Sequence, residues 1–189
     1  MLEGERDIIE FLVKLFNKHG ISYVLTGSFA GSYWGRPRAT HDIDFLVEIE
    51  KPQTEKIISV LKDLGSEFMV DLDMAKRAIK EHDQFNVIHF STTIKIDFWV
   101  AKDNEFEKTK FNRRLAVKLF DDNVFIVTAE DLVLTKLLWC KEIMSERHMR
   151  DCIGILEVQK GKLDKKYLNE TAKTLGITKL LDQARSGDY

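Results

Sequence analysis

Apolar residues recur at helical spacing between residues 5 and 19, which predicts an amphipathic helix, and Gly20 follows as a typical C-cap. Residues 23–26 form a short β-prone run that stops at the Gly-Ser pair of residues 27–28. Residues 29–34 favour a brief helix. The chain is therefore expected to open with a helix, a strand, a tight turn and a second helix.

The next run alternates between acidic and apolar residues, as the two faces of a strand do. Its acidic positions are Asp42, Asp44 and Glu48, and its apolar positions are Ile43, Phe45, Val47 and Ile49. Asp42 and Asp44 are therefore expected to project from one face of this strand. A helix is expected from Pro52 to Leu64, because apolar residues again recur at helical spacing there.

Two further pairs of β-prone runs predict hairpins. Residues 85–90 and 94–100 are separated by three polar residues, and residues 117–120 and 124–127 are separated by Asp-Asp-Asn. Asp97 lies in the middle of the second run and points to the face opposite its apolar neighbours. Residues 94–100 are therefore the second predicted strand, after the one with Asp42 and Asp44, that carries an aspartate.

From Thr128 to its end the chain has helical patterns, which begin with an N-cap threonine and acidic first-turn residues. They continue at residues 146–158 and 164–175. This order of elements predicts an α+β fold with a mixed β-sheet flanked by helices. We expect a core of residues 1–127 and a C-terminal helical region, residues 128–189, packed on that core.

The composition is that of an ordinary globular protein and adds few constraints. Of the 189 residues, 44% are hydrophobic and 32% are charged, and the net charge of -2 excludes a general basic field for binding nucleic acid. Cys140 and Cys152 lie in apolar helical patterns and are expected to be buried thiols. Neither a signal-type stretch nor an apolar run of about 18 residues is present, so we expect a cytoplasmic location and no membrane contact.

Three short features carry the candidate chemistry: the Gly27-Ser28 turn, the Asp-Ile-Asp run at residues 42–44, and Asp97. Carboxylates two residues apart on a strand repel one another unless a cation lies near both. If the strand with Asp97 pairs alongside, three carboxylates converge and suit Mg²⁺ or Mn²⁺. Two such ions would clamp the attacking and leaving oxygens of a phosphoryl transfer. The turn would complement them, because glycine before a helix N-terminus lets N–H groups approach a phosphate.

The chain resembles the DNA polymerase beta-type nucleotidyltransferase superfamily in three motifs: Leu-Thr-Gly-Ser-Phe-Ala, Gly-Arg-Pro-Arg-Ala-Thr-His-Asp-Ile-Asp-Phe and Lys-Ile-Asp-Phe. The second motif is similar to that of small bacterial and archaeal nucleotidyltransferase-like proteins, some of them partners in toxin-antitoxin systems. The resemblance covers about residues 20–160. It implies a palm-like nucleotidyltransferase core that transfers a nucleoside monophosphate from an NTP to an acceptor and releases pyrophosphate.

Under this resemblance, Asp42, Asp44 and Asp97 would be the catalytic residues and would bind two Mg²⁺ or Mn²⁺ ions. Asp97 would also help to activate the acceptor. Gly27 and Ser28 would hold the triphosphate of the NTP, with ATP as the expected donor.

Further nucleotide contacts are implied at Arg38, Thr40 and Lys136, which match positions that the subgroup keeps. Each also has a simpler interpretation, because Arg38 and Thr40 lie in a polar loop and a lysine on an amphipathic helix is usually solvated. The subgroup often has a second acidic residue three positions after the one at Asp151, where this chain has Gly154. We therefore expect Asp151 to form ordinary ion pairs within its helix.

Two other groups of residues are interpreted as structural. Asp71 and Asp73 repeat the Asp-x-Asp spacing without a preceding Gly-Ser pair, which favours a loop or a helix cap. The tryptophans Trp34, Trp99 and Trp139 are expected in the core rather than as platforms for a base.

The leading hypothesis is a metal-dependent nucleotidyltransferase whose acceptor is a hydroxyl on a protein, an RNA end or a small molecule. The alternative is an antitoxin-like regulatory protein that docks to a partner toxin with little or no turnover. A third hypothesis is a sensor that binds metal and NTP without turnover. The sequence does not identify the acceptor.

Overall fold

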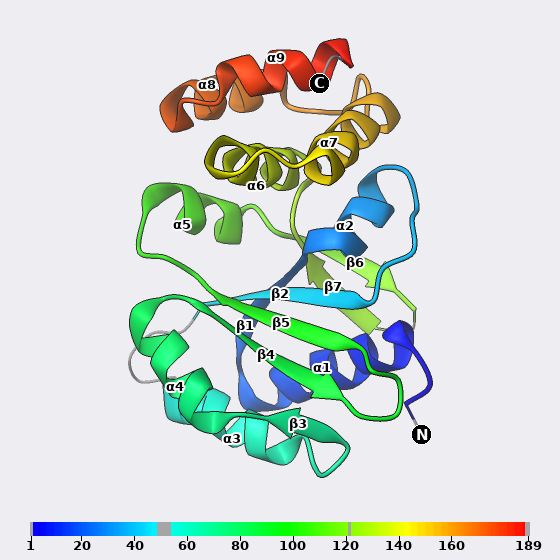
Figure 1. The fold of residues 1–189 in the computed structure, drawn as a ribbon, viewed down its shortest axis with the longest axis vertical. Helices are drawn as coiled ribbons and strands as arrows, with labels where there is room; N and C mark the ends of the chain where they lie inside the picture. Colours follow the sequence, from blue (N-terminus) through cyan, green and yellow to red (C-terminus); the bar gives the residue numbers. More distant parts are fainter. Residues whose placement is uncertain (1, 49–53, 121, 188–189) are drawn as a thin grey trace. The chain divides into compact units, whose positions relative to one another are not determined.

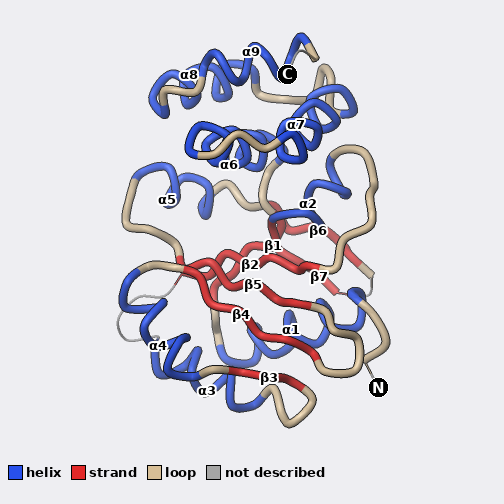
Figure 2. Tube along the Cα trace, viewed as in Figure 1, coloured by secondary structure: helices blue, strands red, loops and turns tan. Residues whose placement is uncertain are grey.

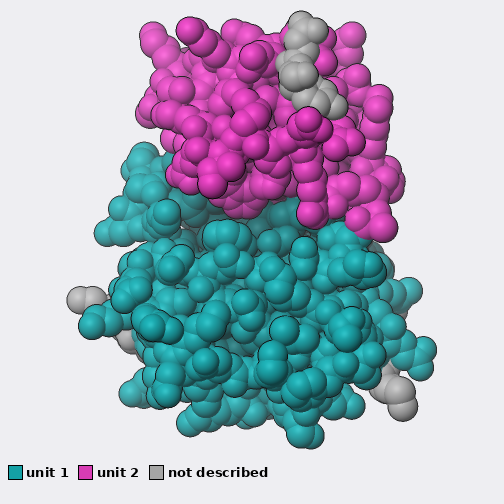
Figure 3. Space-filling model, viewed as in Figure 1, with its two compact units in different colours: residues 1–29, 40–126 teal, residues 30–39, 127–189 magenta. Residues whose placement is uncertain are grey.

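The computed structural model describes residues 2–48, 54–120 and 122–187, and its contacts divide the chain into two compact units. The first unit comprises Met1–Phe29 and Thr40–Ile126, and the second comprises Ala30–Ala39 and Val127–Tyr189 (Figure 3). A core of residues 1–127 with the C-terminal helices packed on it stays a prediction. Nothing in the sequence pattern indicates that residues 30–39 belong with the C-terminal helices.

A mixed β-sheet of seven strands forms the centre of the first unit, counted over the described residues (Figure 2). The strands are β1 (Ser22–Thr26), β2 (Asp42–Glu48), β3 (Phe68–Val70), β4 (Gln84–His89), β5 (Lys95–Val100), β6 (Leu115–Leu119) and β7 (Asp122–Ile126). Their order is β3-β4-β5-β2-β1-β7-β6. The β2–β5 and β1–β7 pairs are parallel and the other pairs are antiparallel. The expected mixed sheet is therefore confirmed.

Helices cover one face of this sheet and bury an aromatic cluster against it. The helices of the first unit are α1 (Glu5–His19), α3 (Thr54–Asp63), α4 (Leu72–Glu81) and α5 (Glu105–Asn112). Figure 1 shows α1, α3 and α4 on the same side of the sheet. Phe16 of α1 packs on the rings of Tyr23, Phe45 and Phe98, which come from three neighbouring strands. The polar residues that alternate with these rings must therefore lie on the opposite face.

Most of the expected elements are present in the first unit. Helix α1 ends at Gly20 in the left-handed conformation with φ 64°, and both predicted hairpins are formed. Ile49 and Pro52, expected in a strand and at a helix start, lie outside the described residues, as does Asp121 between β6 and β7. Asp71 is the N-cap of α4 and accepts hydrogen bonds from two backbone N–H groups, as the capping interpretation predicted. Strand β3 and the body of α4 were not predicted from the sequence.

One helix, α2 (Gly27–Trp34), begins in the first unit and continues in the second. It starts at Gly27 directly after β1, so the predicted tight turn is itself the first turn of the helix. The remainder of the second unit is helical, as expected: α6 (Ala129–Glu142), α7 (Glu146–Val158), α8 (Lys165–Leu175) and α9 (Thr178–Ser186). Thr128 is the N-cap of α6, where its hydroxyl accepts a hydrogen bond from the N–H group of Asp131.

Residues 30–39 are held within the second unit by hydrogen bonds over long sequence distances. The indole N–H of Trp34 donates to the carbonyl of Val127 at 2.7 Å, and the Gln159 amide donates to the Trp34 carbonyl at 2.7 Å. Cys140 and Cys152 are buried, as expected. A search of the described helices finds none that is long and apolar enough to cross a bilayer.

Candidate active site

The register of β2 and β5 aligns the three predicted carboxylates. Asp44 is the parallel partner of Asp97, and Asp42 is the partner of Lys95. Because partner residues on adjacent strands project to the same side, all three aspartates lie on the face opposite the aromatic cluster. The same row continues through Thr26 on β1, which is the partner of Asp44. The fold therefore brings Asp42, Asp44 and Asp97 to one face of the sheet, as the sequence predicted.

Asp97 is the most deeply buried of these carboxylates and is 4% exposed. Its Oδ2 accepts an ion-paired hydrogen bond from Nζ of Lys95 at 2.7 Å, whereas Oδ1 has no hydrogen-bond partner among the described atoms. The hydrogen bond to Asp97 raises the pKa of Lys95 above its ordinary value. A buried carboxylate oxygen without a partner is costly, and a ligand at this oxygen would remove that cost.

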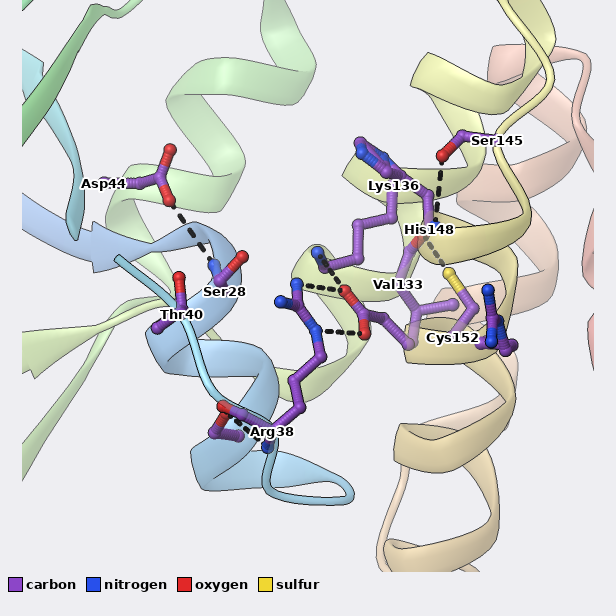
Figure 4. A network of polar contacts seen from close by, with 12 residues as sticks. Ser28, Arg38, Thr40, Asp44, Val133, Lys136, Ser145, His148 and Cys152 are labelled. Atoms are coloured by element: carbon purple, nitrogen blue, oxygen red, sulfur yellow. Dashed lines mark hydrogen bonds and ion pairs between the residues drawn. The ribbon is translucent and has the colours of Figure 1, made fainter. Parts of the chain in front are cut away.

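Asp44 is oriented by contacts from two different elements. Its Oδ1 accepts a hydrogen bond from the indole N–H of Trp99 on β5 at 3.3 Å. Its Oδ2 accepts one from the backbone N–H of Ser28 at 3.4 Å, which Figure 4 shows at the start of α2. The prediction that Trp99 is a core residue is wrong, because its side chain lies on the polar face, only partly buried, and contacts Asp44. Its position two residues after Asp97 was the signal for this role.

Gly27 allows α2 to begin directly beside Asp44. Its φ is 63°, a conformation that side chains with a Cβ rarely adopt, and a Cβ at this position would overlap with the Asp44 carboxylate. Glycine is therefore required by both the backbone conformation and the close approach. The approach brings the N-terminal N–H groups of α2 to the carboxylate row.

We expect Gly27→Ala to lower the free energy of unfolding by about 2 kcal/mol or more, because it adds steric overlap to the backbone strain. Gly20→Ala is the matched control: Gly20 has φ 64°, and apart from its neighbours in the chain no described residue comes within 4 Å of the position of its added Cβ. The control should cost only about 1 kcal/mol. Urea denaturation of both variants measures the difference, and equal losses would show that the contact with Asp44 is unimportant.

Thr40 fixes the backbone at the start of β2. Its hydroxyl accepts a hydrogen bond from the Asp42 N–H and is within hydrogen-bonding distance of the Asp42 carbonyl, each at 3.2 Å. This contact positions Asp42 through the backbone, and a nucleotide contact of Thr40 stays a prediction. Among the described residues, no three His, Cys, Asp or Glu side chains are already gathered around a point that could hold a metal ion. Asp97 is ion-paired with Lys95, and Asp44 accepts hydrogen bonds from Trp99 and Ser28.

The second unit contains a separate cluster of buried charges around Asp151 of α7. Arg38 donates to both carboxylate oxygens of Asp151, at 3.0 Å and 3.1 Å, and Nζ of Lys136 donates to Oδ2 at 2.9 Å. Burial alone would raise the pKa of Asp151. The hydrogen bonds and charges of Arg38 and Lys136 together outweigh this effect, so the pKa lies below its ordinary value. Figure 4 shows Arg38 and Lys136 in this cluster.

This cluster corrects two interpretations drawn from the sequence. Lys136 is 2% exposed and ion-paired, so it is not a solvated helix residue. Asp151 pairs with Arg38, which is 113 positions away in the chain, and with Lys136, which is 15 positions away, rather than with residues of its own helix. Sequence reasoning missed Asp151 because its partners are remote in the chain. Nucleotide contacts of Arg38 and Lys136 stay predictions.

Two titratable residues near this cluster are poorly suited to catalysis near neutral pH. Burial, followed by the charge of Lys136, lowers the pKa of His148 to about 4, so its ring is neutral. Burial also raises the pKa of the Cys152 thiol well above its ordinary value, and the thiol contacts the Val133 carbonyl (Figure 4). Neither residue therefore offers an imidazolium acid or a thiolate nucleophile.

The model of the family described as "Nucleotidyl transferase AbiEii toxin, Type IV TA system" matches residues 10–179 of the chain. The chain belongs to the AbiEii nucleotidyltransferase family. The expected nucleotidyltransferase resemblance and enzyme class are thereby confirmed. A comparison with curated protein sequences found no match.

Solved structures resemble this AbiEii family member in fold. The antibiotic-resistance factor ANT(2'')-Ia has a TM-score of 0.56 at 12% identity, over 99% of this chain and 94% of that chain. The lincosamide antibiotic adenylyltransferase LnuA has a TM-score of 0.55 at 14% identity, over 79% and 95% of the two chains. An antigenic nucleotidyltransferase-like protein from Paracoccidioides brasiliensis has a TM-score of 0.52 at 14% identity, over 97% and 92%. These likenesses confirm the expected α+β nucleotidyltransferase fold.

Proposed function

We propose that this protein transfers a nucleoside monophosphate, with ATP as the expected donor, from an NTP to a hydroxyl acceptor. Two divalent ions, Mg²⁺ or Mn²⁺, would be held by Asp42, Asp44 and Asp97. The observation that carries the proposal is the pairing of Asp44 with Asp97 across β2 and β5, with Asp42 on the same face. Carboxylates aligned in this way from two strands form a donor set that suits hard divalent cations.

The residues present fit such ions in chemistry. Oδ1 of Asp97 is buried with no hydrogen-bond partner among the described residues, and three carboxylates on one face of the sheet concentrate negative charge there. Asp44 accepts hydrogen bonds from the neutral N–H groups of Trp99 and Ser28, which orient its carboxylate in this row. When bound, the ions would polarise the phosphate oxygens and stabilise charge on the attacking and leaving oxygens.

The protein's own groups would position the reactants. The acceptor oxygen attacks the α-phosphorus, the bond to pyrophosphate breaks, and the acceptor proton passes to the Asp97 carboxylate. The backbone N–H groups at the start of α2 would donate to the phosphates, and Gly27 allows them to approach closely. Trp99 and Ser28 would keep Asp44 in place during the transfer.

Calorimetric titration of ATP, GTP, CTP and UTP with Mg²⁺ tests the proposal without knowledge of the acceptor. We expect at least one NTP to bind in Mg²⁺, with binding lost in EDTA and in an Asp42→Asn, Asp44→Asn double variant. The NTP that binds is then labelled at its α-phosphate. Transfer of this label to protein, RNA or small hydroxyl compounds identifies the class of the acceptor. Failure of all four NTPs to bind the wild type would refute the proposed function.

The family description supports a toxin role for the transfer reaction, with an antitoxin as the expected partner. This reverses the alternative drawn from the sequence, in which the chain was the antitoxin and its partner the toxin. A toxin of this kind requires turnover, so arrest of growth on expression should depend on the three aspartates. A cytoplasmic location agrees with this role and stays a prediction.

A further inference from the structure

We propose that Lys95 is an internal counter-ion that occupies the carboxylate site in the metal-free protein and competes with the divalent ions for Asp97 and Asp42. This inference rests on the proposed function and deepens it. In this role Lys95 sets the affinity of the site for metal ions. It acts through Asp97 and Asp42 and does not itself contact the reacting atoms, so it is not a catalytic residue.

The position of Lys95 on β5 directs its ammonium group to two of the proposed metal ligands. Lys95 is the register partner of Asp42, and it lies two residues before Asp97 on the same face of the sheet. Its Nζ is 2.7 Å from Oδ2 of Asp97 and 3.9 Å from Oδ1 of Asp42. The ammonium group therefore contacts one carboxylate directly and lies close to a second carboxylate on the neighbouring strand.

The carboxylates need a cation when no metal ion is bound. Asp97 has a side chain that is only 6% exposed, and a carboxylate at this depth without a counter-ion is strongly disfavoured. Asp44, the register partner of Asp97, adds a second negative charge beside it. Lys95 donates to Oδ2 of Asp97, whereas Oδ1 has no hydrogen-bond partner in the part of the chain that the structure describes, so the ammonium group satisfies only one of the two oxygens.

The same lysine is able to leave. Its side chain is 39% exposed, and the ammonium group is carried on a flexible four-carbon stem that can reach water without a change in the backbone. A divalent ion brings twice the charge and coordinates several carboxylate oxygens together. A metal ion on Oδ1 of Asp97 is repelled by the ammonium group on Oδ2, and a metal ion that also coordinates Oδ2 requires the Lys95–Asp97 ion pair to open. Both effects lower the apparent metal affinity.

The experiment compares Lys95→Met, which removes the charge at similar volume, with wild type and with Lys76→Met. Lys76 forms an exposed ion pair with Asp73 on α4, so this control removes the same net charge elsewhere. Titration with Mn²⁺, followed by electron paramagnetic resonance of the free ion, measures affinity. Thermal unfolding in EDTA and in Mn²⁺ measures whether the ion replaces the lysine.

We expect Lys95→Met to bind Mn²⁺ about tenfold more tightly than wild type. We also expect the unfolding temperature of Lys95→Met to be lower than that of wild type in EDTA and to rise more when Mn²⁺ is added. Lys76→Met should behave like wild type. Binding by Lys95→Met alone, with none by wild type, would support the competition in its strongest form. Equal or weaker binding by Lys95→Met overturns the inference but leaves the proposed metal site intact, whereas no binding by either protein overturns both.

Lys95→Arg keeps the inference testable if Lys95→Met does not fold. Arginine retains the charge and can pair with a carboxylate through two hydrogen bonds, so this variant should bind Mn²⁺ as weakly as wild type or more weakly. Tighter binding by Lys95→Arg would contradict the competition.

Discussion

Replacement of Asp44 by asparagine is expected to reduce nucleotidyl transfer by at least about a thousandfold, a loss of roughly 4 kcal/mol of transition-state stabilisation. Asparagine keeps the size of the side chain and an oxygen that accepts the hydrogen bond from Trp99, so the fold should be retained. What is lost is the negative charge in the row with Asp97, together with the acceptor of the Ser28 N–H hydrogen bond at 3.4 Å. The rate of pyrophosphate release with the preferred NTP and acceptor measures the effect, and thermal unfolding checks the fold.

The chain contains its own control for this experiment in the second Asp-x-Asp run. Asp73 has a side chain that is 95% exposed and pairs with Lys76 at 3.4 Å on the surface of α4. Asp73→Asn makes the same chemical change and should leave the rate within about twofold of wild type. A rate above a tenth of wild type for Asp44→Asn, or an equal loss in Asp73→Asn, would refute the assignment of Asp44.

Asp151→Ala is expected to lower the free energy of unfolding by about 3 to 5 kcal/mol, because it leaves the buried ammonium group of Lys136 without its carboxylate. Arg38 also loses both of its hydrogen bonds to Asp151. Urea denaturation followed by circular dichroism measures the loss. Lys136→Met combined with Asp151→Leu should recover most of it, since apolar residues of similar volume can replace a buried ion pair.

Glu157→Ala provides the comparison on the same helix. Glu157 pairs with Arg36 of the same 30–39 segment, but the two side chains are 53% and 74% exposed. Removal of this surface ion pair should cost less than about 1 kcal/mol. If Glu157→Ala and Asp151→Ala destabilise the protein equally, the burial of the Asp151 cluster does not explain its contribution.

Local patterns were sufficient to predict much of the sheet unit. Alternation identified β2 and β5 and assigned their aspartates to one face, and a glycine after an apolar helix identified the end of α1. The missed elements differ in how clearly the sequence indicates them. Strand β3 has only three residues, whereas α4 buries Ala75, Ala78 and Ile79 at helical spacing, which small apolar side chains make easy to overlook.

The contacts within the site could not be predicted in the same way. The pairing of Asp44 with Asp97 depends on a parallel register between strands that are separated by two helices and two strands in the chain. Periodicity determines which face a side chain occupies but not which residue of another strand lies beside it. The lysine in the Lys-Ile-Asp-Phe motif was visible in the sequence, yet only the register indicates that it also approaches Asp42.

The passage of α2 from one unit into the other has a consequence for the order of folding. Residues 30–39 are synthesised early, but their partners are Val127, Asp151 and Gln159, at separations of 93 to 125 residues. Contacts at such separations form late because the entropy of closing the intervening loop must first be overcome. A nascent chain that ends after β7 would therefore hold the complete sheet with residues 30–39 lacking these three partners. Synthesis of α7 and Gln159, rather than completion of the sheet, would be the step that completes the hydrogen bonding of this segment.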